Sequence, residues 1–412
     1  MATDAGVPGR VRGMRDLLPD DMDRVRLIEA TFASTCRAWG YREVRTPVIE
    51  PLYLFTAAGT LSPKTLDRVY SFLDWDGWSG ERVVLRPDST IPAARLYTEH
   101  FGSDAVAKLF YRQNIFRFTD DGSSREEWQC GVELIGDTGL AGDVELALLA
   151  TETVRALGLP DVALHVSHAG IVRAVLAAAA YSSDEQVQAY DRLLDGDLSV
   201  VDEVEARMPG LNAPLRLLFD VEGAGSAYLA NVRASLARAV PALVRPIDEL
   251  SFVVAALEAL GIQPVIQAVL ARSFEYYSGP LFKMYAGGTR VASGGRYDGL
   301  LALVGDRSVP ASGFALYVTP AIEAMPQAAP SSDTIVVLVQ PAADSNTLVA
   351  RVQEAAARLR AAGMTALAIA PEGLEPTHRL RCRADGFELS GAGDSATLTG
   401  IDDVVAALRA AS

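Results

Sequence analysis

Gln129 and Glu133 have the spacing of two side chains that line one pocket. They are four residues apart in a segment that reads as a strand over residues 129–135, and side chains at i and i+4 of a strand point to the same side. Buried carboxylate and carbonyl oxygens are the groups that offset the desolvation of a bound ammonium group. The pair therefore predicts two polar groups that can point into one pocket, and the alternative is two exposed strand residues.

A second candidate set lies between residues 272 and 299. Gly294 and Gly295 lack side chains and would let the backbone approach a ligand closely, although a tight turn also explains the pair. Tyr277 is a candidate ligand contact, and its alternative is a core aromatic residue.

Histidine and cysteine residues do not have the pattern of a metal site. His165 and His168 lie three apart after an expected strand, and because a zinc site needs more ligands we interpret them as packed or turn histidines. Cys36, Cys130 and Cys382 are odd in number and lack metal-ligand spacing, which favours buried small apolar residues. We expect no metal, no disulfide framework and no cofactor.

The elements that must position these residues are mostly strands. Strands are expected at residues 41–50, 69–74, 82–86, 108–112, 129–135, 162–166, 281–285 and 311–317. Thr46-Pro47 indicates an edge or strand end because proline lacks the ladder donor, and Asp76-Gly77 indicates a hairpin turn. Strands that follow strands with few intervening helices predict an antiparallel sheet and an α+β fold.

Helices are expected at the N-terminus and in the middle of the chain. Val25, Ile28, Phe32 and Cys36 have helical spacing over residues 20–37 and are followed by Gly40. The composition of residues 170–262 changes to Ala, Leu and Val with scattered charges, which is typical of a helical insertion within the sheet domain.

The chain is expected to form two domains. Residues 1–325 make the sheet domain with its insertion, and residues 326–333 read as a linker. Residues 334–412 contain a buried strand, a helix over 346–362 and a second strand over 365–370, which predict a βαβ unit and a small α/β domain.

Charge and hydropathy exclude several classes of protein. A formal net charge of −15 opposes non-specific binding to nucleic acid. No run approaches the roughly 18 apolar residues that span a bilayer, and the first residues do not resemble a signal peptide. We therefore expect a cytoplasmic protein with no membrane partner.

Several motifs in order resemble the catalytic domain of class II aminoacyl-tRNA synthetases of the histidyl type. They are the Thr46-Pro47 strand, Leu85-Arg-Pro-Asp-Ser-Thr90, Phe116-Arg117 and Gln129-Cys-Gly-Val-Glu133, followed by Arg272-Ser-Phe-Glu-Tyr-Tyr-Ser-Gly279 and Ala292-Ser-Gly-Gly-Arg-Tyr-Asp-Gly299. The last two resemble the family's histidine-specific signatures. The similarity runs from about Gly13 to Glu323 and implies a class II synthetase-like antiparallel sheet.

The resemblance implies a pocket for histidine. Asp88, Gln129 and Glu133 match the family's positions for the amino group and imidazole, while Arg272 and Tyr277 match contacts to the carboxylate and imidazole. The full expected set is Asp88, Thr90, Arg117, Gln129, Glu133, Arg272, Tyr276, Tyr277, Gly294 and Gly295.

The sequence departs from the family where a synthetase holds ATP. Arg117 matches the arginine that grips the α-phosphate, but Asp120 and Asp121 follow where synthetases have a basic loop. Synthetases also follow Gly-Phe-Ala with a Gly-x-Glu-Arg segment, whereas this chain reads Gly313-Phe-Ala-Leu-Tyr-Val-Thr-Pro-Ala321 with Pro320 at the arginine position. Proline has no side-chain donor and is expected to break the helix that would present one. Adenylation should be crippled, so we expect no catalytic residue.

Degenerate domains of this kind resemble the regulatory subunits of ATP phosphoribosyltransferase, the first enzyme of histidine biosynthesis. The resemblance implies a non-catalytic subunit that forms a homodimer, joins a short-form catalytic subunit in a hetero-oligomer and mediates feedback inhibition by histidine, with tRNA not expected as a partner. The alternatives are a divergent histidyl-tRNA synthetase and a stand-alone histidine-binding paralogue.

Overall fold

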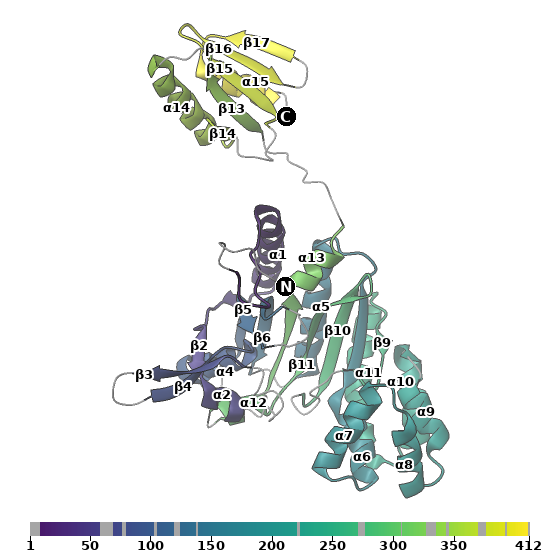
Figure 1. The fold of residues 1–412 in the computed structure, drawn as a ribbon. Helices are drawn as coiled ribbons and strands as arrows, with labels where there is room; N and C mark the ends of the chain where they lie inside the picture. Colours follow the sequence, from purple (N-terminus) through teal and green to yellow (C-terminus); the bar gives the residue numbers. More distant parts are fainter. Residues whose placement is uncertain are drawn as a thin grey trace. The chain divides into compact units, whose positions relative to one another are not determined.

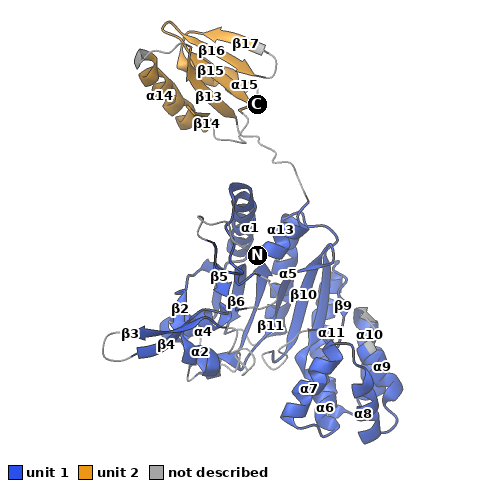
Figure 2. Ribbon diagram, viewed as in Figure 1, with its two compact units in different colours: residues 1–326 blue, residues 327–412 orange. Residues whose placement is uncertain are grey.

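A computed structural model describes most of the chain. The described residues are 9–57, 69–75, 80–102, 105–118, 124–136, 139–220, 223–270, 277–305, 307–326, 335–342, 346–369, 376–391 and 394–410. The chain divides into two compact units, residues 1–326 and 327–412 (Figure 2). No helix among the described residues is both long and apolar enough to cross a membrane.

Unit 1 is built on a large sheet that positions the candidate residues (Figure 1). Its described strands, in spatial order, are β1 (Arg42–Glu43), β5 (Ala107–Phe116), β6 (Glu126–Ile135), β12 (Ala311–Tyr317), β11 (Thr289–Arg296), β10 (Pro280–Ala286), β7 (Ala163–His168), β9 (Val265–Ile266) and β8 (Gly223–Ala224). The six strands from β5 to β7 pair antiparallel, and β1–β5 and β7–β9 pair parallel. The prediction of an antiparallel α+β fold is confirmed.

Helices cover one face of this sheet with the main core. α1 (Pro19–Ala38) begins with proline at its first position and with two acidic residues in its first turn, which suit a helix N-terminus. Its Phe32 ring contacts Phe110 of β5 and Phe314 of β12 edge-on, with centroids 6.2 and 6.1 Å apart. Apolar residues of α5 (Leu140–Ala156), α11 (Val244–Ala259) and α13 (Val318–Ala324) belong to the same core.

The other face carries a smaller apolar cluster near one end of the sheet. It is built from α2 (Leu52–Ala57), α4 (Thr90–His100) and α12 (Leu300–Val304), and it includes Leu109, Ile135 and Tyr297. This is the face on which Glu133 lies, because Glu133 pairs with Leu109 across β5 and β6.

The region between β7 and β10 is mostly helical. It contains α6 (Ala169–Ala178), α7 (Ser183–Leu194), α8 (Ser199–Arg207), α9 (Asn212–Asp220), α10 (Gly225–Leu236), a 3-10 turn (Pro241–Leu243) and α11. The change of composition after residue 170 therefore marked a real change from strands to helices.

The expected strand over residues 41–50 is wrong. It is divided into β1 and β2 (Ile49–Pro51), and β2 joins a separate sheet with β4 (Gly80–Leu85) and β3 (Ser71–Trp75) in the order β2-β4-β3. The carbonyl oxygens of Thr46 and Pro47 accept from the Arg86 guanidinium at 2.9 and 3.0 Å, so a side chain takes the place of a strand partner there. The β3–β4 hairpin is confirmed, and its expected turn at Asp76-Gly77 lies outside the described residues.

Pro320 does not break α13, contrary to expectation. It is the third residue of this helix, where backbone N–H groups have no partner within the helix and proline is tolerated. The position nevertheless lacks a side-chain donor.

Unit 2 is a five-stranded sheet with helices. Its strands are β14 (Thr365–Leu367), β13 (Val336–Pro341), β15 (His378–Cys382), β16 (Phe387–Gly391) and β17 (Asp394–Leu398), in that order, with α14 (Asn346–Ala361) and α15 (Ile401–Ala410). β13 and β14 are parallel and joined through α14, so the expected βαβ unit is confirmed. The three cysteines are buried, as interpreted from the sequence.

Candidate functional site

A buried carboxylate, Glu133 of β6, forms the centre of the candidate site. Only 1% of this residue is exposed. The Tyr111 hydroxyl donates to its Oε1 at 3.0 Å, and the Tyr297 hydroxyl donates to its Oε2. Burial raises the pKa of Glu133 well above its usual range, with a smaller increase from Asp88, while hydrogen bonds from Thr90 and Tyr111 oppose the shift.

Glycines make the space that this cluster needs. Gly313 of β12 lies directly opposite Glu133, and a Cβ atom at Gly313 would meet the Glu133 carboxylate and lie 2.7 Å from the Tyr297 hydroxyl oxygen. A Cβ atom at Gly131 would collide with the Tyr111 ring. Both glycines therefore leave space for the side chains of the site, a role that was not predicted from the sequence.

Asp88 and Thr90 reach this site from the start of α4. The Asp88 Oδ1 accepts from the backbone N–H of Ile91 at 3.0 Å, which fixes the carboxylate at the helix N-terminus. Burial raises the pKa of Asp88, opposed by hydrogen bonds from backbone N–H groups and by Arg117. A hydrogen bond with the Thr90 side chain opposes the increase that burial causes in the pKa of Glu133 and also in that of Tyr111. The start of α4 therefore meets β5 and β6 at this site.

Arg117 lies at the border of the site. Its Nε donates to the carbonyl oxygen of Pro87 at 2.9 Å, and its Nη1 is 3.9 Å from Glu127 Oε2. About two fifths of the side chain, 44%, is exposed. The guanidinium group is thus anchored next to Asp88 while part of it faces solvent, which suits a contact to a ligand carboxylate.

Gln129 shares a face with Glu133. It is buried and lies opposite Gln113 of β5 and Tyr317 of β12. The alternative that Gln129 and Glu133 are exposed strand residues is therefore wrong.

The first of the two histidine-specific signatures, residues 272–279, is described only in part. Arg272 and Tyr276 lie outside the described residues. Tyr277 is half-buried and packs against a small apolar cluster. Burial raises the pKa of Tyr277, and Tyr317, Asp88 and Glu133 add to the increase, which indicates that these groups lie near one another.

Gly294 and Gly295 lie inside β11, so the tight-turn alternative is wrong. Gly295 is opposite Gly313 and shares the face of Glu133, whereas Gly294 is opposite Phe314 on the helix-covered face. A Cβ atom at Gly294 would meet the carbonyl oxygen of Gly313 and the Cβ of Phe314. Close packing of strands accounts for Gly294 without a ligand.

A buried ion pair supports β11 from the helix-covered face. Arg296 donates from Nε and Nη2 to Asp143 Oδ2 at 3.0 and 2.9 Å, and Ser312 Oγ donates to Asp143 Oδ1 at 2.8 Å. Burial raises the pKa of Asp143 to about 6, although Arg296 and Ser312 oppose the shift. No spacing in the sequence linked these three residues.

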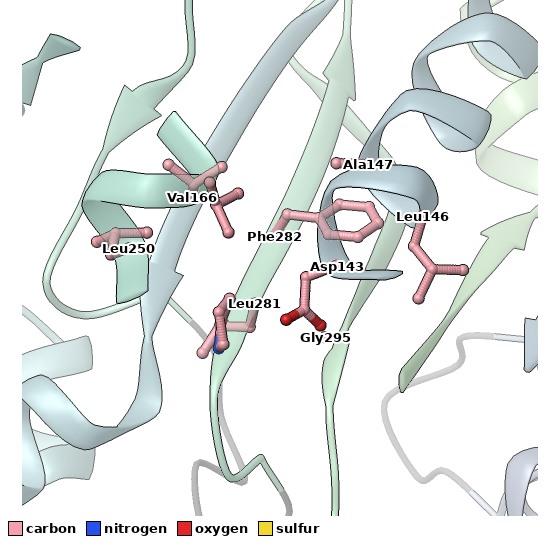
Figure 3. A pocket seen from close by; sticks show the side chains of 10 residues that line it. Asp143, Leu146, Ala147, Val166, Leu250, Leu281, Phe282 and Gly295 are labelled. Carbon is pink, nitrogen blue, oxygen red and sulfur yellow. The ribbon is translucent and has the colours of Figure 1, made fainter. Parts of the chain in front are cut away.

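A small cavity lies beside this ion pair. Figure 3 shows the Asp143 carboxylate close to Gly295 and the Phe282 ring turned toward Leu146 and Ala147 of α5. The rest of the lining is mainly apolar and comes from β7, β10 and α11: Val166, Leu250, Val253, Pro280 and Leu281. Because Asp143 is already paired, this cavity is a packing feature behind the candidate site.

His168 has a structural position. The backbone N–H of Gly170 donates to its Nδ1 at 3.0 Å, so Nε2 carries the proton and donates to Glu249 Oε2 at 2.8 Å. The ring thereby caps α6, which confirms the interpretation as a packed histidine. The His165 Nδ1 lies 3.1 Å from Gln267 Oε1.

Comparisons with known proteins identify the family of the chain. The profile of the family described as Histidyl-tRNA synthetase matches residues 13–321. The chain belongs to this family, and its fold is that of a class II synthetase-like domain.

Within the family, the chain is 49% identical over 319 residues to the ATP phosphoribosyltransferase regulatory subunit of Dehalococcoides mccartyi, covering 76% of this chain and 77% of the relative. It is 32% identical over 341 residues to the histidine–tRNA ligase of Methanosarcina acetivorans, covering 80% and 78%. A solved structure described as an ATP phosphoribosyltransferase regulatory subunit/histidyl-tRNA synthetase from Bacillus halodurans matches with a TM-score of 0.75 at 24% identity, covering 90% and 95%.

Proposed function

We propose that this chain is a non-catalytic regulatory subunit of ATP phosphoribosyltransferase that binds histidine and conveys feedback inhibition to a separate short-form catalytic subunit. The observation that carries the proposal is the buried Glu133 carboxylate, held by Tyr111 and Tyr297 and close to Asp88. The 49% identity to a protein named as such a subunit supports the same role.

Histidine suits this set of groups. Buried carboxylates need a compensating cation or donor, and the ligand's ammonium group and imidazole N–H supply both. Arg117 would receive the ligand carboxylate as a fork. Asp88, Thr90, Gln129, Glu133, Tyr277 and Gly295 are the described residues proposed to surround the ligand, with Arg272 and Tyr276 as further contacts.

Loss of adenylation supports a regulatory role. Attack of the histidine carboxylate on the α-phosphate of ATP, with pyrophosphate as the leaving group, requires cations that stabilise the developing charge, and Pro320 offers none at the start of α13. The sequence places Asp120 and Asp121 after Arg117, and like charge opposes a triphosphate.

A homodimer is proposed as the core of the assembly. Val48 and Ile49 follow the Thr46-Pro47 segment and are exposed, and Phe72, Leu73 and Trp75 of β3 are exposed in the same three-stranded sheet. Neighbouring exposed apolar residues are typical of a surface that a partner covers, and a second copy is the partner we propose.

Regulation would follow from differential affinity. If histidine binds one state of the complex more tightly than the other, it shifts the population toward that state and changes the partner's activity. No chemistry by this chain is required.

The decisive experiment combines the chain with a short-form transferase and measures phosphoribosyl transfer to ATP with and without histidine. The transferase should be slow alone and faster with this protein, and histidine should reverse the gain. If co-purification and light scattering detect no complex with the transferase of the same genome, the stand-alone histidine-binding paralogue becomes the better assignment.

The second candidate is a divergent histidyl-tRNA synthetase, favoured by the 32% identity to a histidine–tRNA ligase. It predicts histidine-dependent ATP–pyrophosphate exchange at rates of about 1 s⁻¹ or above, as for enzymes in general. The regulatory proposal predicts exchange at background, and robust exchange with formation of histidylated tRNA would favour the synthetase.

A further inference from the structure

Tyr317 occupies a position on the candidate site's face that none of the preceding roles explains. It is the last residue of β12 and lies directly opposite Gln129. Side chains of directly paired residues point to the same face of a sheet, so Tyr317 lies on the face of Gln129 and Glu133. It also precedes α13, whose third residue is Pro320.

Two contacts hold the Tyr317 side chain over the sheet. Its hydroxyl oxygen lies 2.5 Å from Ser293 Oγ of β11, and the Arg290 guanidinium carbon lies 5.3 Å from the centroid of its ring. Ser293 belongs to the neighbouring strand, so the ring extends from β12 toward β11 instead of into solvent. A hydrogen bond and a cation–π contact both oppose its displacement.

The sheet next to Tyr317 is made of small residues. Ser293 lies opposite Ala315, which lies opposite Gly131. One step further along the strands, Gly295 lies opposite Gly313, which lies opposite Glu133. Two adjacent rows of small residues thus separate Glu133 from Tyr317 on β12 and β11, while the Tyr111 ring covers Gly131.

The same end of the sheet carries Arg117. Phe116, its neighbour, pairs with Glu126 at the end of β5 and β6, beyond the Gln113–Gln129 pair. A bound amino acid would place its amine near Glu133 and Asp88 and its carboxylate near Arg117. Its carboxyl group would therefore point toward the Gln129–Tyr317 pair.

We propose that Tyr317 is a specificity-determining residue that limits the ligand to a free amino acid by excluding derivatives enlarged at the carboxyl group, above all aminoacyl nucleotides. This inference rests on the proposed histidine site. An enlarged ligand would have to displace the ring, breaking the contact with Ser293 and uncovering Arg290. Tyr317 also stands where the Gly-x-Glu-Arg segment of synthetases begins with glycine, so the exclusion comes from one side chain in addition to the missing cations.

The test compares two ligands on the full chain by calorimetry. One is histidine, and the other is a non-hydrolysable histidyl-adenylate analogue in which a sulfamoyl group replaces the phosphate. The readout is the ratio of the two dissociation constants within each variant, so a general change in folding does not alter it. The wild type should bind histidine more tightly than the analogue by about tenfold or more, since tenfold corresponds to 1.4 kcal/mol.

Tyr317→Gly should shift this ratio toward the analogue by about tenfold, and Ser293→Ala should shift it in the same direction by less, because the ring then loses its anchor. Tyr317→Phe keeps the ring but removes the same hydroxyl contact with Ser293, so it should shift the ratio only as much as Ser293→Ala does. A wild type that prefers the analogue, or a Tyr317→Gly variant that binds histidine with an unchanged ratio, overturns this inference alone. A wild type that binds no histidine overturns the proposed function together with it.

Discussion

The Tyr297 hydroxyl donates a hydrogen bond to the Glu133 carboxylate although the two residues are 164 positions apart in the sequence. Tyr297 directly follows β11, and β12, which carries Gly313, lies between β11 and the strand of Glu133, β6. The second histidine-specific signature, residues 292–299, therefore contributes a tyrosine hydroxyl group to the carboxylate site in addition to its glycines. Substitution of either residue should therefore change the hydrogen bonding of the other.

Glu133→Gln should weaken histidine binding by about 1–3 kcal/mol, because the amide loses the charge and its NH2 group faces one of the two hydroxyl groups that donate to the carboxylate. Calorimetric titration measures the effect. Glu81→Gln is a matched control, since Glu81 is an exposed residue of β4. Equal affinities of the wild type and the Glu133 variant would exclude this carboxylate from the ligand site.

Gly313→Ala should lower both stability and histidine affinity. The new methyl group would meet the Glu133 carboxylate and lie 2.7 Å from the Tyr297 hydroxyl oxygen, and forcing such contacts typically costs about 1–3 kcal/mol. Urea denaturation measures the free energy of unfolding. Gly299→Ala is the control, because a Cβ atom there has nothing within 4 Å. Similar stabilities of the two variants would show that the cluster tolerates a methyl group.

Asp143→Asn should flatten the pH dependence of stability between about pH 4 and 6. Burial raises the folded-state pKa of Asp143 to about 6 from its ordinary value of 3.8, so the folded protein binds the proton more tightly than the unfolded chain. The stabilising contribution is complete below pH 3.8 and is lost as pH rises through 6, a change of about 3 kcal/mol.

The comparison is made by urea denaturation of wild type and Asp143→Asn at several pH values. The wild type should lose stability relative to the variant as pH rises, whatever the constant cost of leaving Arg296 without its anion. A difference between the two that stays constant from pH 4 to 7 would contradict the raised pKa.

In the complex with the transferase, Glu133→Gln should retain activation and lose inhibition by histidine. The substitution alters only the effector's differential affinity for two states of the complex, whereas activation depends on contact between the chains. Steady-state assays over a range of histidine concentrations measure both effects. Parallel loss of activation and inhibition would indicate that the variant no longer assembles.

Local pattern was sufficient for the elements with regular periodicity. The stripe at Val25, Ile28 and Phe32 gave a helix, and the positions of Gln129 and Glu133 on one strand face were predictable from their spacing. β11 was not expected as a strand, because Ser293, Gly294 and Gly295 have low strand propensity. Residues 289–296 form a strand because they pair with β10 and β12 on either side.

The missed site residues depend on contacts that are remote in sequence. Tyr111, Tyr297 and Gly313 meet only because β5, β6, β12 and β11 are neighbours in the sheet, an order that differs from their order in the chain. Tyr111 lies in the strand expected over residues 108–112, but nothing in that pattern marked its hydroxyl group as a partner of Glu133. No local signal distinguished Gly313 from an ordinary strand glycine.

The Arg86 side chain connects the segment before β2 with the end of β5. Its guanidinium group is buried and binds carbonyl oxygens of Thr46, Pro47 and Asn114, and uncovering such a cation from these partners costs on the order of several kcal/mol. Pro87 and Asp88 follow it directly. Asp88 and the Thr46-Pro47 segment, which precedes Val48 and Ile49 of the proposed dimer surface, are therefore tied to the same buried guanidinium group.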